Sequence, residues 1–181
     1  MPRYVAFLRA INVGGHNTKM AELRRLFEAL GFSGVETFIA SGNVIFETKS
    51  TAMARLKGKV ETCLSEALGY PVSVFVRTDS EIAAIAQCKP FPDSAVKTAR
   101  AFWVGFVAAP LGRESERAVM GFKTAIDDFH VDGREIYWLC RKGQSESKFS
   151  NAALERRLGI RATFRGMKTI HRLASKYPPL K

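Results

Sequence analysis

The order of its hydrophobic runs predicts that this chain of 181 residues is an α+β protein built by tandem duplication. Each half has the order strand, helix, strand, strand, helix, strand. Each half also contains two β-rich runs joined by a glycine-containing turn, which is the pattern of a hairpin. With right-handed crossovers this order gives a ferredoxin-like βαββαβ subdomain, an antiparallel sheet with both helices on one face. We expect one subdomain at residues 1–88, a connector at 89–98 and a second subdomain at 99–181.

The elements of the first half follow from short apolar runs and from helical spacing. Strands are expected at 4–8, 35–39, 43–46 and 72–76. Apolar residues recur at spacings of three and four after Thr18, which is the expected N-cap of the first helix, and Gly31 fits its C-terminal end. Two further helices are expected at 53–64 and 79–86.

The second half begins after Pro90 and Pro92, which exclude a regular helix or a central strand from residues 89–94. Strands are expected at 101–107, 128–131, 135–140 and 161–165, and helices at 113–123 and 151–158. Asp132-Gly133 supplies the hairpin turn and Gly159 ends the second of these helices.

Positive charge is the strongest compositional signal. The chain has 28 Lys and Arg residues against 17 Asp and Glu residues, a net charge of +11. The excess lies at the C-terminal end, because residues 141–181 contain 11 basic and two acidic residues. Such a segment attracts anionic partners, although a solvated basic surface that only aids solubility is the alternative interpretation.

Several classes of protein are excluded by composition. No apolar run approaches the roughly 20 residues that cross a bilayer, and the first residues enter a strand pattern, so we expect a cytoplasmic protein without membrane contact. Cys63, Cys88 and Cys140 are far apart and lack metal-ligand spacing, and the chain has three histidines. We therefore expect free thiols, no metal and no cofactor.

The strand order 4-1-3-2 of a split βαβ sheet determines which loops share an edge. In the first half the loop after the first strand and the turn after the second strand lie together. The candidate ligand-binding residues at this edge are Asn12, Gly14, Gly15, His16, Lys19, Ser41 and Asn43. Backbone N–H groups at a helix start, together with Lys19, favour an anion here.

The opposite edge of the second half collects the start of its second helix and the end of its last strand. The candidate ligand-binding residues there are Ser147, Lys148, Arg165, Lys168, Thr169 and Arg172. Arg165, Lys168 and Arg172 precede or lie on the last helix, where spacings of three and four align them with Lys176 as a phosphate track.

No motif assigns a reaction to these residues. The Walker A and G-x-G-x-x-G patterns are absent, and Ser147-Lys148 lacks the S-x-x-K spacing of a serine nucleophile. His16 has no neighbour in the sequence that would activate it as a base. We therefore predict no catalytic residue.

Several segments together resemble the bacterial family called domain of unknown function 1697. They are Arg9-x-Ile11-Asn12-Val13-Gly14-Gly15, Met20, Ser41-Gly42-Asn43-Val44-x-Phe46, Pro90-Phe91, Ser147-Lys148 and Thr163-x-Arg165-x-x-x-Thr169. The resemblance implies a tandem ferredoxin-like fold and no established activity. The chain departs from the family pattern at Ala10, where Gly is usual, at Ala40, where Gln is usual, and at residues 166–168, where Gly-Met-Lys replaces Asn-Trp-Asn.

Three functions remain open at this point. The leading hypothesis is a non-enzymatic binder of an anionic ligand, with nucleic acid as the favoured partner because of the basic C-terminal segment. The second is an enzyme that acts on a small phosphorylated or carboxylated molecule at the loop of residues 12–19. The third is an assembly module that joins other chains through its sheet edges.

Overall fold

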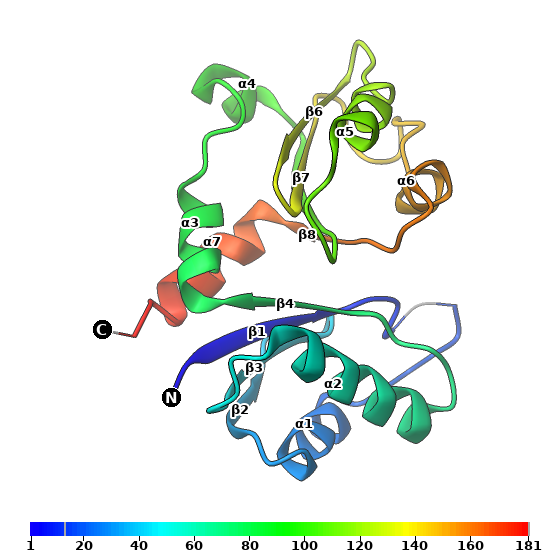
Figure 1. Ribbon diagram of the computed structural model, residues 1–181. Coiled ribbons are helices and arrows are strands. Elements are labelled where there is room, and N and C mark those ends of the chain that lie inside the picture. The colour runs from blue at the N-terminus through cyan, green and yellow to red at the C-terminus, as the bar shows by residue number, and fades with distance from the viewer. Residues whose placement is uncertain (13, 181) are drawn as a thin grey trace. The chain divides into compact units, whose positions relative to one another are not determined.

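The computed structural model describes residues 1–12 and 14–180, which form two compact units (Figure 1). The first unit contains Met1–Ala84 together with the chain from Leu173 onward, and the second unit contains Ile85–Arg172. Each unit has its own four-stranded sheet and its own hydrophobic core. The predicted α+β class and the predicted duplication are therefore confirmed.

The first unit follows the predicted order of elements. These are β1 (Arg3–Leu8), α1 (Met20–Ala29), β2 (Ser33–Thr37), β3 (Asn43–Glu47), α2 (Met53–Leu68) and β4 (Val74–Thr78), followed by α3 (Asp79–Gln87). The strands lie in the order β2-β3-β1-β4 and every neighbouring pair is antiparallel. This order is the one expected for a split βαβ sheet.

Alternation along β1 explains how the core of the first unit forms. Tyr4, Ala6 and Leu8 belong to the cluster that α1 and α2 cover. Val5 and Phe7, which are also buried, point to the other face of the sheet, because successive strand residues alternate between faces. The helices contribute Leu23 and Phe27 from α1 and Leu56, Val60 and Leu64 from α2.

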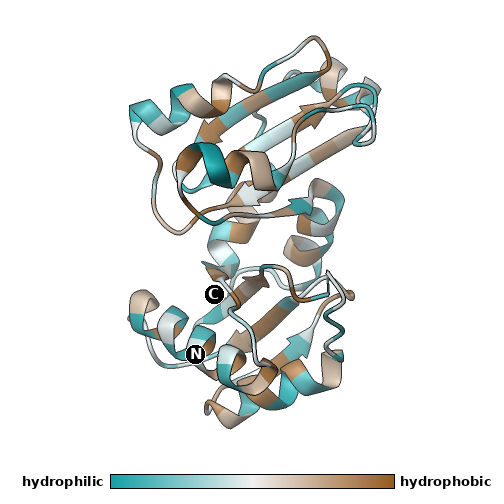
Figure 2. Cartoon of the chain, turned by 90° about the vertical axis from the view of Figure 1, so that its right-hand side faces the viewer, coloured by the Kyte–Doolittle hydropathy of each residue, from teal (hydrophilic) through white to brown (hydrophobic). Residues whose placement is uncertain are grey.

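The second unit repeats this architecture. After α4 (Asp93–Thr98) it contains β5 (Ala101–Phe106), α5 (Arg113–Met120), β6 (Asp127–Asp132), β7 (Glu135–Cys140), α6 (Asn151–Leu158), β8 (Thr163–Gly166) and the first part of α7 (Met167–Lys176). The antiparallel strands lie in the order β6-β7-β5-β8. Apolar residues, brown in Figure 2, follow the strands, whereas the helices carry both brown and teal residues.

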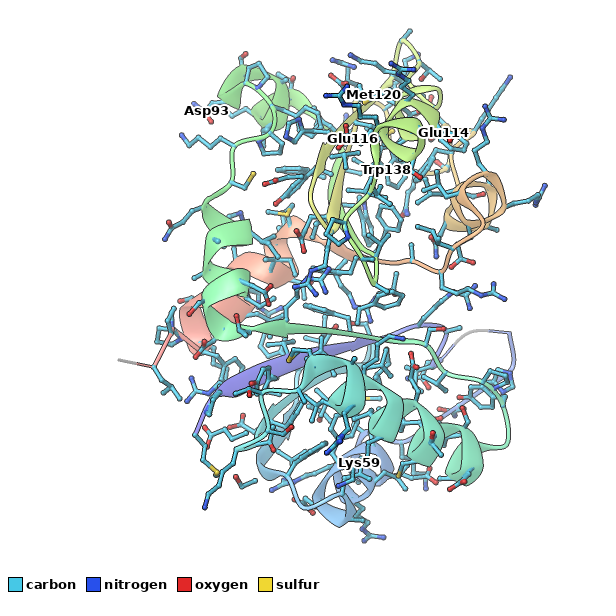
Figure 3. All side chains as sticks on the ribbon, in the orientation of Figure 1. Lys59, Asp93, Glu114, Glu116, Met120 and Trp138 are labelled. Carbon is cyan, nitrogen blue, oxygen red and sulfur yellow. The ribbon has the colours of Figure 1, made fainter. Side chains whose placement is uncertain are left out.

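An aromatic cluster fills the core of the second unit. Trp138 on β7 lies on the side of the sheet where α5 runs (Figure 3). The ring of Phe149 lies 4.8 Å from the Trp138 ring and 4.8 Å from the Phe129 ring, measured between centroids. Phe149 belongs to the loop before α6, so this packing fixes the path of that loop against the sheet.

The predicted connector contains a helix. α4 begins at Asp93, directly after Pro92, which occupies its N-cap position. The exclusion of helix from residues 89–94 was too broad, because proline is compatible with the start of a helix, where its missing N–H would be unpaired in any case.

The last residues of the chain lie in the first unit, whereas the sequence placed them in a second subdomain at 99–181. Tyr177 donates a hydrogen bond of 2.6 Å to the Glu36 carboxylate, and Lys176 forms an ion pair of 3.0 Å with the same group. The Leu180 N–H donates to the Asp79 carboxylate at 3.1 Å. These partners are more than 90 residues away in the sequence, so local patterns gave no sign of them.

None of the helices in residues 1–12 and 14–180 is long and apolar enough to cross a membrane.

Candidate functional site

The two loops predicted to share an edge of the first unit do meet. The Leu8 N–H donates a hydrogen bond of 2.8 Å to the carbonyl of Gly42. The Asn12 side-chain amide donates to the carbonyl of Ala40 at 3.2 Å. A Cβ at Gly42 would lie 2.7 Å from the Ile11 side chain, so glycine allows this close approach. The topological argument therefore placed the two loops correctly.

The polar side chains at this edge hold the loops together. The Oδ1 atom of Asn12 accepts a hydrogen bond of 2.8 Å from the Thr18 N–H. Asn43 is fully buried, and its amide donates to the Phe38 carbonyl at 2.9 Å and to the Ser41 hydroxyl at 2.8 Å. Side chains used in this way contribute to the shape of the edge, and Asn43 is engaged within its own turn.

The loop after β1 is also attached to Tyr70. The His16 ring stacks on the Tyr70 ring with 3.7 Å between centroids, and the Tyr70 hydroxyl donates to the Ile11 carbonyl at 3.3 Å. The Tyr70 hydroxyl also lies 3.3 Å from the Thr18 hydroxyl, so these contacts attach the loop to the chain that precedes β4. The remaining candidates of this edge, Gly14, Gly15, Lys19 and Ser41, are exposed. Val13 of the family motif lies outside the described residues.

The predicted edge of the second unit contains a step, because β8 ends before its neighbour β5 does. β8 pairs with β5 from Phe106, opposite Thr163, to Trp103, opposite Gly166. Ala101 and Phe102 lie beyond the end of β8, where the chain turns into α7. A cavity of about 550 Å³ occupies this step between the strand and the helix.

The cavity combines aromatic and cationic side chains. Its wall includes Phe102 and Trp103, both partly buried, and the side chains of Arg100, Lys168 and His171, all exposed. The other lining residues are Val96, Ala99, Ala101, Gln144, Gly166 and Met167. We call this set of 11 residues the β5–α7 pocket.

The loop after β7 completes the β5–α7 pocket. The Arg100 N–H donates to the Cys140 carbonyl at 3.0 Å, which joins the start of β5 to the end of β7. The loop beyond Cys140 then turns back, since Cys140 Sγ donates to the Gly143 carbonyl at 3.3 Å. This turn brings the exposed amide of Gln144 to the pocket.

The predicted binding residues of this edge differ in whether they line the pocket and in how exposed they are. Lys168 lines the β5–α7 pocket, and Arg172 is exposed one helical turn further along α7. Thr169 is partly buried on the same helix and Lys148 is exposed in the loop before α6. Lys176, which was expected to extend the track, is paired with Glu36 as described above.

Arg165 is buried and so does not belong to an exposed track. Its guanidinium donates hydrogen bonds to the Thr163 hydroxyl at 2.8 Å and to the Phe164 carbonyl at 2.9 Å. Burial disfavours the charged form and lowers the pKa of Arg165 to about 10. The group remains protonated at neutral pH and acts inside the second unit.

Ser147 is likewise engaged inside the second unit. Its hydroxyl lies 2.9 Å from both oxygens of the buried Asp127 carboxylate, to which it donates, and it accepts from the Phe149 N–H at 3.0 Å. The Trp138 indole also donates to Asp127, at 2.9 Å. The structure therefore gives Ser147 structural partners and leaves its ligand-binding role a prediction.

The sequence argument missed most of the pocket wall. It considered the end of the last strand and the start of the second helix, but the start of β5 lies at the same edge and was left out. Arg100, Phe102 and Trp103 could have been found by this extension, since β5 and β8 are antiparallel neighbours. Gln144 and His171 carried no such signal.

A second cavity of about 630 Å³ lies between α5 and α6. Its wall mixes Glu114, which is labelled in Figure 3, with Arg117 and Arg157. Charges of both signs favour no particular ionic ligand. In residues 1–12 and 14–180, no group of three or more His, Cys, Asp or Glu side chains is arranged to hold a metal ion.

Comparison with known proteins supports the fold and identifies the family. The structure of the conserved bacterial protein SP0830 from Streptococcus pneumoniae is similar to this chain, with a TM-score of 0.77 and 25% sequence identity over 98% of each chain. No curated protein matches the chain. The model of the family described as protein of unknown function DUF1697 matches residues 1–137, and the chain belongs to this family.

Proposed function

We propose that the protein binds single-stranded nucleic acid without modifying it, and that the edge of the second unit around the β5–α7 pocket is the contact surface. The observation that carries this proposal is the composition of the pocket, in which Phe102 and Trp103 lie beside Arg100 and Lys168. Proteins that bind single strands combine a basic surface for the phosphates with aromatic rings for the bases.

The charge of the surrounding chain supports the same ligand. Residues 141–181 contain 11 basic and two acidic residues. Within that segment Lys148, Lys168 and Arg172 are exposed, and the last two lie one turn apart on α7. Phosphates near such groups release their counterions, which makes binding favourable and strongly dependent on salt.

The chemistry of the pocket favours binding over catalysis. Among the 11 described residues that line it, there is no carboxylate, hydroxyl or thiol side chain. His171 is the one imidazole among the described lining residues, and no lining carboxylate is present to orient it or to accept a proton from it. An acid–base or nucleophilic mechanism needs such a partner within hydrogen-bond reach.

Fluorescence anisotropy of a labelled, unstructured oligonucleotide tests the proposal. Binding should weaken as salt is added, and Lys168→Ala and Arg172→Ala should each lower the slope of log K against log salt by about 0.7, the value for one contact on a single strand. Arg156→Ala is the matched control, because Arg156 is exposed on α6 and does not line the pocket. It removes the same charge and should leave the slope unchanged.

Two results would contradict the proposal. One is the absence of detectable binding at low salt. The other is a slope that is the same in the wild-type protein, in both α7 variants and in the control, since the basic segment would then be solvated surface without a role in binding.

A further inference from the structure

We propose that the β5–α7 pocket holds a single unstacked nucleotide, with the base against the aromatic wall and its phosphate beside Arg100 and Lys168. This inference rests on the proposed function and specifies how the strand is bound. It assigns the pocket a ligand of defined chemistry, a nucleobase that carries a phosphate.

The size of the pocket indicates one nucleotide. Its volume of about 550 Å³ lies within the usual range for small-ligand sites, about 300–1,000 Å³. A continuous run of stacked bases needs an open groove along several strands. The pocket instead occupies the step where β8 ends at Gly166 and β5 continues to Ala101. A base would have to leave the stack to enter it.

The wall of the pocket includes two aromatic rings on which a base can stack. Phe102 and Trp103 are neighbours in β5 and therefore point to opposite faces of the sheet, so the pocket extends around the edge of the strand. Trp103 packs against the core of the second unit and is still partly exposed. Met167 and Val96 add further apolar side chains. Aromatic side chains favour bases of any sequence, because every base has a π-face.

The polar groups of the pocket are of the types that a nucleotide needs. Gln144 carries both a donor and an acceptor, which can pair with the hydrogen-bonding edge of a base. Arg100 and Lys168 are exposed cations, and His171 follows Lys168 by three positions on the same helix. The described lining residues include no acidic side chain that would repel a phosphate.

The chain carries its own reporter for this test. It has two tryptophans, and Trp138 is buried in the core with its indole bound to Asp127. Trp103 is therefore the tryptophan that a bound base would quench. We expect titration with adenosine 5′-monophosphate to quench the fluorescence to saturation, while ribose 5-phosphate, which lacks the base, leaves it unchanged.

Variants of the two aromatic residues distinguish binding of a base in the pocket from binding of phosphates elsewhere on the surface. Trp103→Leu should abolish the quenching, and Phe102→Leu should weaken nucleotide binding roughly tenfold, in line with the loss of one aromatic contact. An oligonucleotide should bind the wild-type protein about tenfold more tightly than an abasic oligomer with the same number of phosphates. If Trp103→Leu does not unfold cooperatively, Phe102→Leu tests the pocket alone.

The outcomes distinguish this inference from the proposed function. Equal affinity for the two oligomers, with no quenching by either oligomer or by the mononucleotide, would overturn the pocket assignment while salt-dependent binding of nucleic acid stands. Quenching by the mononucleotide without binding of any oligomer would overturn the proposed function and support the pocket.

Discussion

Replacing Ser147 by alanine tests whether this residue is structural. The Asp127 carboxylate is 1% exposed and accepts hydrogen bonds from three side chains. Ser147 donates at 2.9 Å, Trp138 at 2.9 Å and Thr124 at 3.0 Å. The variant Ser147→Ala removes one donor from a buried charge and also removes the acceptor of the Phe149 N–H.

The expected loss of stability follows from these contacts. A hydrogen bond to a charged group contributes about 1.5–3 kcal/mol. Part of the loss at Phe149 is recovered if water reaches its N–H, so we expect Ser147→Ala to lower the free energy of unfolding by about 2–3 kcal/mol. For a chain of this length about 1 kcal/mol shifts Tm by about 2–4 °C, which gives a decrease of roughly 4–12 °C.

Urea denaturation followed by tryptophan fluorescence measures this loss. Trp103 and Trp138 both lie in the second unit, so the signal reports that unit. Ser145→Ala is the control, because Ser145 is exposed in the same loop, and it should change stability by less than about 0.5 kcal/mol. A loss below about 0.5 kcal/mol for Ser147→Ala as well would refute the reasoning. The anisotropy assay should show unchanged oligonucleotide affinity for Ser147→Ala.

Two further predictions concern the first unit. Ala10 has φ = 59°, a conformation that glycine adopts more readily, so Ala10→Gly should stabilise the unit by about 0.5–1 kcal/mol. Ala40 is not among the residues with positive φ, so Ala40→Gly should destabilise the unit by a similar amount, because glycine only adds freedom to the unfolded chain. Thermal melts followed by circular dichroism measure both changes, and destabilisation by both variants would contradict this reasoning. The hydrogen bond from Tyr177 and the ion pair with Lys176 lower the pKa of Glu36, so the stability they confer is present above the unfolded-state pKa of about 4.3 and is lost as pH falls through the lower folded-state value. Tyr177→Phe should therefore cost about 0.5–1 kcal/mol at pH 7 and progressively less below pH ~4.3 in urea titrations, and a cost independent of pH would contradict the assignment.

Much of the fold was accessible from the sequence, because periodicity records which side chains face the core. The hairpin strand at Glu135–Cys140 and the helix at Asn151–Leu158 begin and end where the pattern predicted. The first helix begins at Met20 with Lys19 at its N-cap, one residue later than expected. Boundaries vary in this way because the ends of an element depend on capping contacts that the pattern does not record.

The candidate site was only partly accessible. Element order and right-handed crossovers determine which loops share an edge, and this argument led from the sequence to Lys168. The same reasoning could not tell that Arg165, three residues earlier, is buried among its own strand's polar groups. It also could not tell that β8 stops at Gly166 and leaves room for a pocket beside Phe102.

The sequence by itself determined most of the elements, their order and the excess of positive charge near the C-terminus, since these depend on local spacing and composition, but it missed α4. The tertiary structure alone decided which polar groups are available to a ligand. Ser147 is engaged by Asp127, Lys176 by Glu36 and Asn43 by its own turn, whereas Lys168 reaches a pocket. The reason is physical: a buried polar group must find a partner, and that partner can come from any part of the chain that folding brings near.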